Sequence, residues 1–150
     1  MKKNKLVIIL AIIVIIGAII GYLFVFRDKD AYSDKRIKLI INAATLEVRL
    51  YANETAEAFY NKLNDGHLVI EVSDDGQNKK IGNLTYTMPT NDIDGSMSVG
   101  DIVLYEGHKL AVIYGKSTGN MTKIGKIQNT NATYLQNILG QGNVKLEFFK

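Results

Sequence analysis

Hydrophobic and polar residues follow two patterns along this chain: one long apolar run near its start, and short alternating segments after it. Residues 6–26 carry no charge and consist mostly of Ile, Val and Leu. As a helix rising ~1.5 Å per residue, this run would be about 31 Å long, close to the ~30 Å hydrocarbon thickness of a bilayer. We therefore expect one transmembrane helix from Leu6 to Phe26.

The charges beside the apolar run predict its orientation. Three lysines lie within residues 2–5, whereas the two cations of residues 27–30 alternate with two aspartates. Because cationic flanks stay in the cytoplasm, we expect a single-pass protein of the cell membrane with a cytoplasmic N-terminus and an extracytoplasmic C-terminal domain. A cleaved signal peptide is the alternative, but it would have a shorter apolar region of ~7–15 residues and a small-x-small cleavage site. Residues 1–30 are thus predicted to be an anchor with short flanks, and residues 31–36 a polar tether.

Two glycines in the apolar run are spaced for helix packing. Gly17 and Gly21 form a small-x-x-x-small pair, which lets two membrane helices approach closely. Glycine is also common in membrane helices for other reasons. A homodimer through this face is therefore one interpretation of the pair, beside a monomeric anchor.

Residues 37–150 are predicted to be mainly β-structure. Residues 45–51 alternate apolar and polar side chains, as a half-buried strand does. Further strands are expected at residues 36–41, 67–72, 79–84, 101–105, 109–114, 123–127 and 143–149, with residues 86–98 irregular. Such evenly spaced strands, rarely separated by helices, favour a closed eight-stranded antiparallel barrel, which hides the strand edges.

Two α-helices are expected to cap the barrel. Asn53 is placed to cap the first, which has apolar residues on one face and should end by Gly66. Its aromatic residues Phe59 and Tyr60 are interpreted as core residues rather than as a ligand-binding box. Asn131 is placed to cap the second helix, which ends at Gly140 and Gly142.

Charge and composition exclude several kinds of function. Residues 31–150 contain 13 cationic and 13 anionic residues, so the domain has no net charge and no basic surface for nucleic acid. The absence of cysteine excludes disulfides, thiolate metal sites and a cysteine nucleophile. No cofactor is predicted.

Several segments resemble the cyclophilins, and more closely a bacterial and archaeal family of cyclophilin-like domains. Residues 45–51 followed by Thr55-Ala-Glu-Ala-Phe-Tyr60 resemble the strand-then-helix opening of cyclophilins. The closer family is matched by residues 81–84, 88–91, 100–105, 110–115 and 124–127. The resemblance spans residues 37–149 and implies an eight-stranded barrel closed by two helices.

The resemblance does not extend to the cyclophilin catalytic motif. True cyclophilins place a catalytic arginine soon after the first helix, whereas residues 65–98 contain no arginine, and the chain has no tryptophan. Prolyl isomerase activity is therefore the alternative to a binding function, and no catalytic residue is predicted.

Two other candidate chemistries are weaker. The histidines, His67 and His108, are interpreted as surface or structural residues, since no nucleophile motif accompanies them. Residues 90–95 followed by Asp101 partly imitate a calcium-binding loop. In a calcium-binding loop the first position is an acid and the last a bidentate glutamate, whereas here they are Thr90 and Asp101. A solvated turn is therefore favoured, and no metal is predicted.

The remaining candidate is a cleft beside the irregular segment. Loops over a barrel that combine polar groups with aromatic walls are common binding sites. The alternative is that Tyr105 and Tyr114, at two of the predicted strand ends, pack in the barrel wall. The predicted ligand-binding residues are Met88, Pro89, Thr90, Asn91, Tyr105 and Tyr114. We accordingly expect a module that binds a peptide segment or a small molecule, or else a diverged peptidyl-prolyl isomerase.

Overall fold

The computed structural model describes residue 9, residues 11–19 and residues 31–150. Residues 11–19 are helical, and the isoleucine and valine side chains among them are exposed. No helix in these described residues is both long enough and apolar enough to span a bilayer. Part of the predicted helix from Leu6 to Phe26, namely residues 6–8, 10 and 20–26 with Gly21 among them, lies outside the described residues. The anchor therefore stays a prediction.

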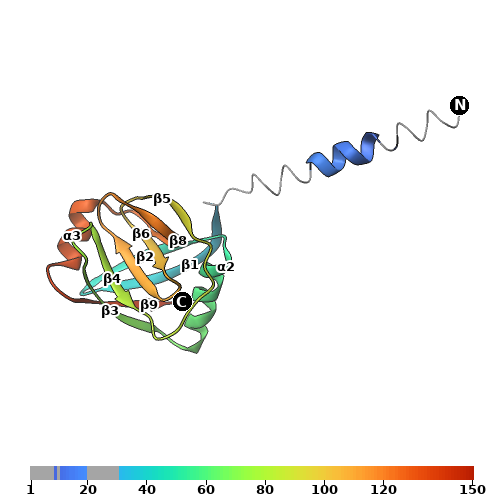
Figure 1. The fold of residues 1–150 in the computed structure, drawn as a ribbon. Helices are drawn as coiled ribbons and strands as arrows, with labels where there is room; N and C mark the ends of the chain where they lie inside the picture. Colours follow the sequence, from blue (N-terminus) through green and yellow to red (C-terminus); the bar gives the residue numbers. More distant parts are fainter. Residues whose placement is uncertain (1–8, 10, 20–30) are drawn as a thin grey trace, which may run out of the picture. The chain divides into compact units, whose positions relative to one another are not determined.

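The second unit of the chain, Tyr32–Lys150, is an antiparallel barrel (Figure 1). Eight strands follow each other around it in the order β2-β1-β9-β3-β4-β7-β6-β8, and β8 pairs again with β2, which closes the ring. β5 pairs with β8 outside this ring. The strands are β1 (Tyr32–Ile41), β2 (Ala44–Tyr51), β3 (Leu68–Asp74), β4 (Lys79–Asn83), β5 (Ile93–Met97), β6 (Asp101–Tyr105), β7 (Lys109–Ile113), β8 (Ser117–Ile127) and β9 (Val144–Phe149). The predicted eight-stranded barrel is confirmed.

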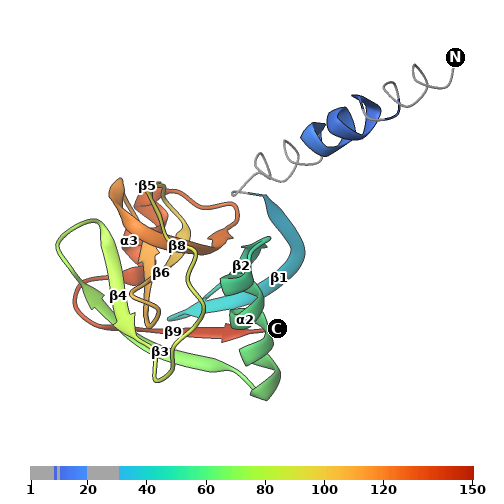
Figure 2. The ribbon, with the colours of Figure 1, turned by 45° about the vertical axis from the view of Figure 1, so that its right-hand side comes forward.

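Two α-helices lie at opposite ends of the barrel (Figures 1 and 2). Helix α2 (Glu54–Lys62) continues into a 3-10 turn (Leu63–Asp65) and lies beside the end of β9, where Phe59 packs edge-on against Phe148. Helix α3 (Ala132–Leu139) covers the other end, where Asn42 Nδ2 donates to the Ile138 carbonyl at 2.7 Å. Both predicted N-caps are confirmed, since Asn53 Oδ1 and Asn131 Oδ1 each accept a hydrogen bond from the helix backbone.

Alternation along the strands produces two apolar clusters on opposite faces of the barrel wall. Ile102 and Leu104 of β6 point into the main core of the barrel, which includes residues from every barrel strand except β4 and from both helices. Val103, between them, belongs to a second cluster with Met97 and Met121. Because successive strand residues face opposite sides, this second cluster lies outside the barrel, under the paired strands β5 and β8.

Three predicted boundaries are wrong. Residues 32–36, assigned to the polar tether, belong to β1: Tyr32 pairs with Tyr51 and stacks on its ring, so polar residues here face solvent from a strand. Residues 86–98 are not wholly irregular, because they contain β5. The strand expected at 123–127 begins at Ser117. Both of the latter errors have one cause, namely that the paired segments 93–97 and 117–121 are mostly polar and contain glycine, with Met97 and Met121 as their buried apolar residues.

Candidate functional site

The β3–β4 hairpin places an acid and a base side by side at the α3 end of the barrel. Asp74 and Lys80 are direct cross-strand partners. Asp74 follows Val72 by two residues, and Lys80 pairs with Val112 of β7. Since Val72 and Val112 belong to the main core, Asp74 and Lys80 lie on the inner face of the wall, at its rim.

Lys80 is the most buried charged side chain of this site, with 1% of its surface exposed. Its Nζ donates to Asp74 Oδ2 at 2.8 Å and to the Gly142 carbonyl at 2.6 Å. A buried ammonium requires such partners, because its desolvation costs several kcal/mol. The two bonds also link the barrel rim to the loop between α3 and β9.

Tyr114 completes the constellation from the end of β7. Its hydroxyl donates to Asp74 Oδ1 at 2.7 Å, so each oxygen of Asp74 accepts one hydrogen bond. The bond from Lys80, followed by that from Tyr114, lowers the pKa of Asp74 below its ordinary value. Burial, with the adjacent Asp74, raises the pKa of Tyr114 to about 12. At neutral pH the site therefore holds a carboxylate and a neutral phenol.

A pocket of about 400 Å³ opens over these three residues. Its other wall is the C-terminal half of α3 and the loop after it, with Leu139 as its buried apolar residue. The wall also carries three exposed carboxamides, and none of their side chains bonds another residue in the described part of the chain. The lining residues are Asp74, Lys80, Tyr114, Gln136, Asn137, Leu139, Gly140 and Gln141.

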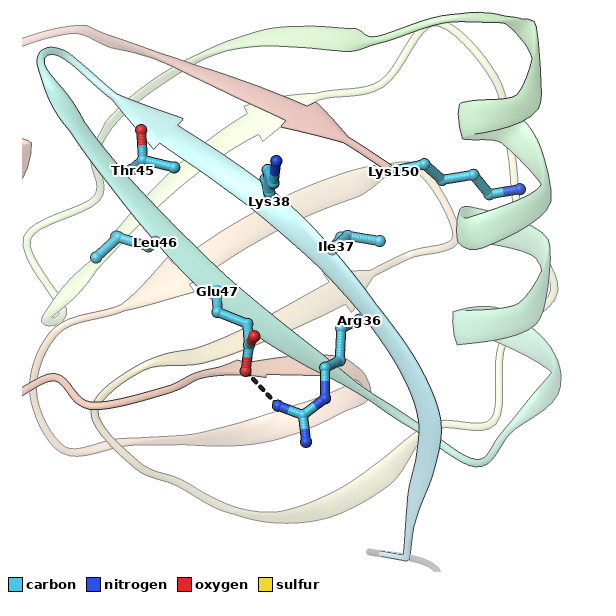
Figure 3. A pocket seen from close by; sticks show the side chains of 7 residues that line it. All are labelled: Arg36, Ile37, Lys38, Thr45, Leu46, Glu47 and Lys150. Carbon is cyan, nitrogen blue, oxygen red and sulfur yellow. Dashed lines mark hydrogen bonds and ion pairs between the residues drawn. The ribbon is translucent and has the colours of Figure 1, made fainter.

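A second hollow, of about 350 Å³, lies on the outer face of β1 and β2 (Figure 3). Arg36 and Glu47 form an ion pair across it, and both side chains are half exposed. Lys150 extends toward α2, where its Nζ lies over the Tyr60 ring. Arg36 and Glu47 are thus solvated and paired with each other, and Lys150 Nζ also donates to Asn64 Oδ1 outside the hollow. We therefore take the α3-end pocket, which has a buried lysine at its base, as the candidate functional site.

The structure does not bring the six predicted ligand-binding residues together. Met88 is buried in the main core, and its backbone N–H donates to the Gly107 carbonyl at 2.8 Å. The Pro89 carbonyl accepts from Thr55 Oγ1 of α2 at 2.6 Å, so this segment lies at the α2 end. Thr90 and Asn91 follow it and are exposed.

The two predicted tyrosines lie apart from each other, and only Tyr105 is near that segment, since it precedes the turn whose Gly107 carbonyl accepts from the Met88 N–H. Tyr105 contacts the second, outer cluster, where burial raises the pKa of its hydroxyl. Tyr114 lies at the opposite end of the adjacent strand, in the α3-end pocket. Of the predicted ligand-binding residues, Tyr114 alone lines that pocket. A binding role for the other five stays a prediction.

The weaker candidates have structural contacts. His67 stacks on Phe149, and His108 Nδ1 lies 2.8 Å from the Glu106 carbonyl. Asp101 is buried in the barrel wall, where it accepts from the Ser98 backbone N–H at 2.8 Å and from Lys126 Nζ at 2.9 Å. No group of three or more potential metal-ligating side chains occurs in the described part of the chain.

Sequence reasoning missed Lys80 and Asp74, although a signal for them exists. Lys79 and Lys80 are consecutive residues of one strand, so one must face outward and the other inward. Asp74 and Asp75 precede the same turn and alternate in the same way. Lys79 and Asp75, which face outward, also form an ion pair, with Lys79 Nζ 2.5 Å from Asp75 Oδ2.

A closed antiparallel barrel of eight strands, with a helix over each end and a polar pocket under one of them, defines the class of cyclophilin-type barrels. Residues 39–148 match the model of the cyclophilin-like family, which covers most of the chain, and the protein therefore belongs to that family. No curated protein and no solved structure matches the chain.

Proposed function

We propose that this protein is a membrane-anchored, extracytoplasmic cyclophilin-like module that binds a small polar ligand in the α3-end pocket without transforming it. The observation that carries the proposal is the Lys80–Asp74–Tyr114 constellation at the base of a cavity. Charged groups placed in a concave site with a few convergent polar partners are typical of ligand-binding pockets. The cavity volume of about 400 Å³ lies within the ~300–1,000 Å³ range of small-molecule sites.

The positions of the arginines favour binding over isomerase activity. In residues 31–150 the arginines are Arg36 and Arg49, on β1 and β2. Arg36 is exposed and paired with Glu47. Arg49 donates to the Ser33 carbonyl at 3.3 Å and lies over the Tyr32 ring. Both are engaged on the outer face, so neither supplies a donor beside an apolar proline pocket. We expect proline-containing tetrapeptides to isomerise at the uncatalysed rate in the presence of the protein. A clear acceleration would favour the isomerase alternative.

The anchoring part of the proposal is supported by the uncharged run of residues 6–26 and by the exposed apolar side chains of residues 11–19. We expect the chain to remain in washed membranes, and the domain to be cleaved by protease added outside spheroplasts. Release as a soluble species without its first thirty residues would contradict anchoring.

A homodimer through the anchor is a separate proposal. A Cβ added at Gly17 would meet no atom within 4 Å, so this position leaves room for a partner helix. Gly17→Leu and Gly21→Leu should lower the crosslinked dimer fraction in membranes, with Ala11→Leu, which also adds a large side chain but on another face of the helix, as the control. An unchanged fraction would exclude this interface.

The pocket itself is tested by a screen of small polar fragments against the isotope-labelled full chain in lipid nanodiscs. Binding fragments should shift the side-chain amide signals of Gln136, Asn137 and Gln141, and the shifts should be lost in Tyr114→Phe or Lys80→Met. Fragments that instead shift the signals of Thr90 and Asn91 would place the site at the α2 end, where the sequence predicted it.

A further inference from the structure

We propose that the ligand of the α3-end pocket is a neutral saccharide unit. This inference rests on the proposed binding function and specifies the chemical class of its ligand. It follows from three properties of the pocket: its charge balance, its hydrogen-bonding groups and the absence of a free strand edge in its wall.

The charged groups that line the pocket neutralise each other. Lys80 and Asp74 are its only charged lining residues, and they form a direct ion pair. A ligand with a net charge would lose hydration on entering and would find no opposite charge available. A neutral ligand avoids this penalty, and the pocket therefore selects against acids and amines.

The hydrogen-bonding groups of the pocket suit hydroxyls. Each of the three carboxamides, on Gln136, Asn137 and Gln141, offers both a donor and an acceptor, and within residues 31–150 none of them is bonded to another residue. A sugar hydroxyl likewise donates and accepts. Several adjacent hydroxyls can therefore be satisfied by several adjacent amides without any ionic contact.

Two further features of the pocket suit a sugar. Asp74 is 40% exposed, and each of its oxygens accepts one protein hydrogen bond, which leaves lone pairs directed away from Lys80 and Tyr114. The half-buried Tyr114 ring offers apolar surface for the C–H face of a sugar.

A peptide fits this pocket less well. Extended peptides gain much of their affinity by adding a strand to a free sheet edge. The strands at this rim have no such edge, because β4 is paired with both β3 and β7. A peptide would thus bind through its side chains alone, whereas a saccharide presents its hydroxyls directly to the carboxamides.

Calorimetric titration of the full chain in sugar-free lipid nanodiscs tests the assignment. The probes are methyl β-glucoside, which is neutral, the anion glucuronate, the cation glucosamine, and N-acetyl-tetraalanine amide. We expect saturable binding of methyl β-glucoside, and binding of the two charged sugars at least tenfold weaker. Asn137→Ala and Gln141→Ala should each weaken glucoside binding about fivefold, the typical effect of one lost hydrogen bond. Asn120→Ala, which removes an exposed carboxamide on β8, is the matched control and should leave binding unchanged.

Three outcomes would overturn the inference, and they are distinguishable. Charged sugars that bind as tightly as the glucoside would refute the charge argument. A tetraalanine amide that binds while the sugars do not would refute the saccharide class but leave the pocket as the binding site. If no sugar or peptide binds and the fragment screen also leaves the pocket signals unmoved, both the saccharide assignment and the proposed function fail.

Discussion

Lys80 Nζ lies 2.8 Å from Asp74 Oδ2, and the two residues face each other directly across the β3–β4 pair. The pair is asymmetric, because the lysine is almost wholly buried whereas the aspartate side chain is 40% exposed. Replacing Asp74 should therefore change the stability of the protein by a different amount from replacing Lys80.

We predict that Asp74→Asn destabilises the protein more than Lys80→Met does. Asp74→Asn leaves the buried ammonium of Lys80 without a counter-charge, with the Gly142 carbonyl and a neutral carboxamide oxygen as its acceptors, and should lower the free energy of unfolding by about 3 kcal/mol. Lys80→Met keeps the volume and leaves a carboxylate that water can reach, so its cost should be about 1 kcal/mol. Urea unfolding measures both values, and the reverse order would show that the lysine tolerates isolation in this site.

The pKa shifts of the site predict how stability depends on pH. The lowered pKa of Asp74 contributes stability above pH ~4 that is lost as pH falls through the folded-state pKa. Tyr114→Phe removes a bond that lowers this pKa, so the folded-state pKa of Asp74 should rise and the stability lost on acidification should be smaller. The raised pKa of Tyr114, about 12, contributes stability that is complete below pH ~10 and lost as pH rises toward 12. Carboxyl NMR titration of Asp74 in both proteins checks the shift, which an unchanged titration would contradict.

Close packing of β4 on β3 makes Gly82 irreplaceable. A Cβ at this position would lie 2.2 Å from the Glu71 carbonyl oxygen and 2.9 Å from Val72 Cγ1. Because the first of these is backbone, the strands must separate, and Gly82→Ala should cost at least about 2 kcal/mol. Gly95→Ala is the control, since a Cβ there meets nothing within 4 Å, and it should change the unfolding free energy by less than about 0.5 kcal/mol. Equal unfolding midpoints for Gly82→Ala and Gly95→Ala would contradict the prediction.

The two capping asparagines differ in the hydrogen bonds that they make beyond the helix. Asn53 caps α2 and also donates from Nδ2 to the Lys123 carbonyl of β8 at 2.8 Å. Asn131 caps α3 through Oδ1. Each cap should contribute about 1 kcal/mol, and the bond to β8 about 1 kcal/mol more. Asn53→Ala should accordingly destabilise the protein about twice as much as Asn131→Ala in thermal unfolding. Equal losses would mean that the link to β8 contributes nothing.

Much of the barrel was predictable from the sequence because its strands alternate clearly. Leu46, Val48 and Leu50 face the core as the pattern indicated, and both capping asparagines act as predicted. The pairing of β5 with the first half of β8 was missed because its burial comes from a cluster outside the barrel. Met97 and Met121 are buried by packing on the outer wall, and local alternation gives no sign of such a second layer.

The candidate site was harder to predict because it depends on distant segments. Tyr114 was singled out as an aromatic strand end, but its partner Asp74 lies 40 residues earlier in the chain. The doubled acids and lysines around the β3–β4 turn could have indicated ion pairs on both faces. The burial of Lys80, however, results from the loop after α3, and no local pattern encodes that contact.

The position of β9 has a consequence for how the chain is completed. This C-terminal strand is inserted between β1 and β3, and pairs with both. A chain emerging from the ribosome can thus join its first hairpin to the other strands through β2 and β8, but it cannot close the ring until residues 144–149 have emerged. Until then the edges of β1 and β3 that β9 covers stay unpaired, which exposes the nascent domain to edge-to-edge aggregation.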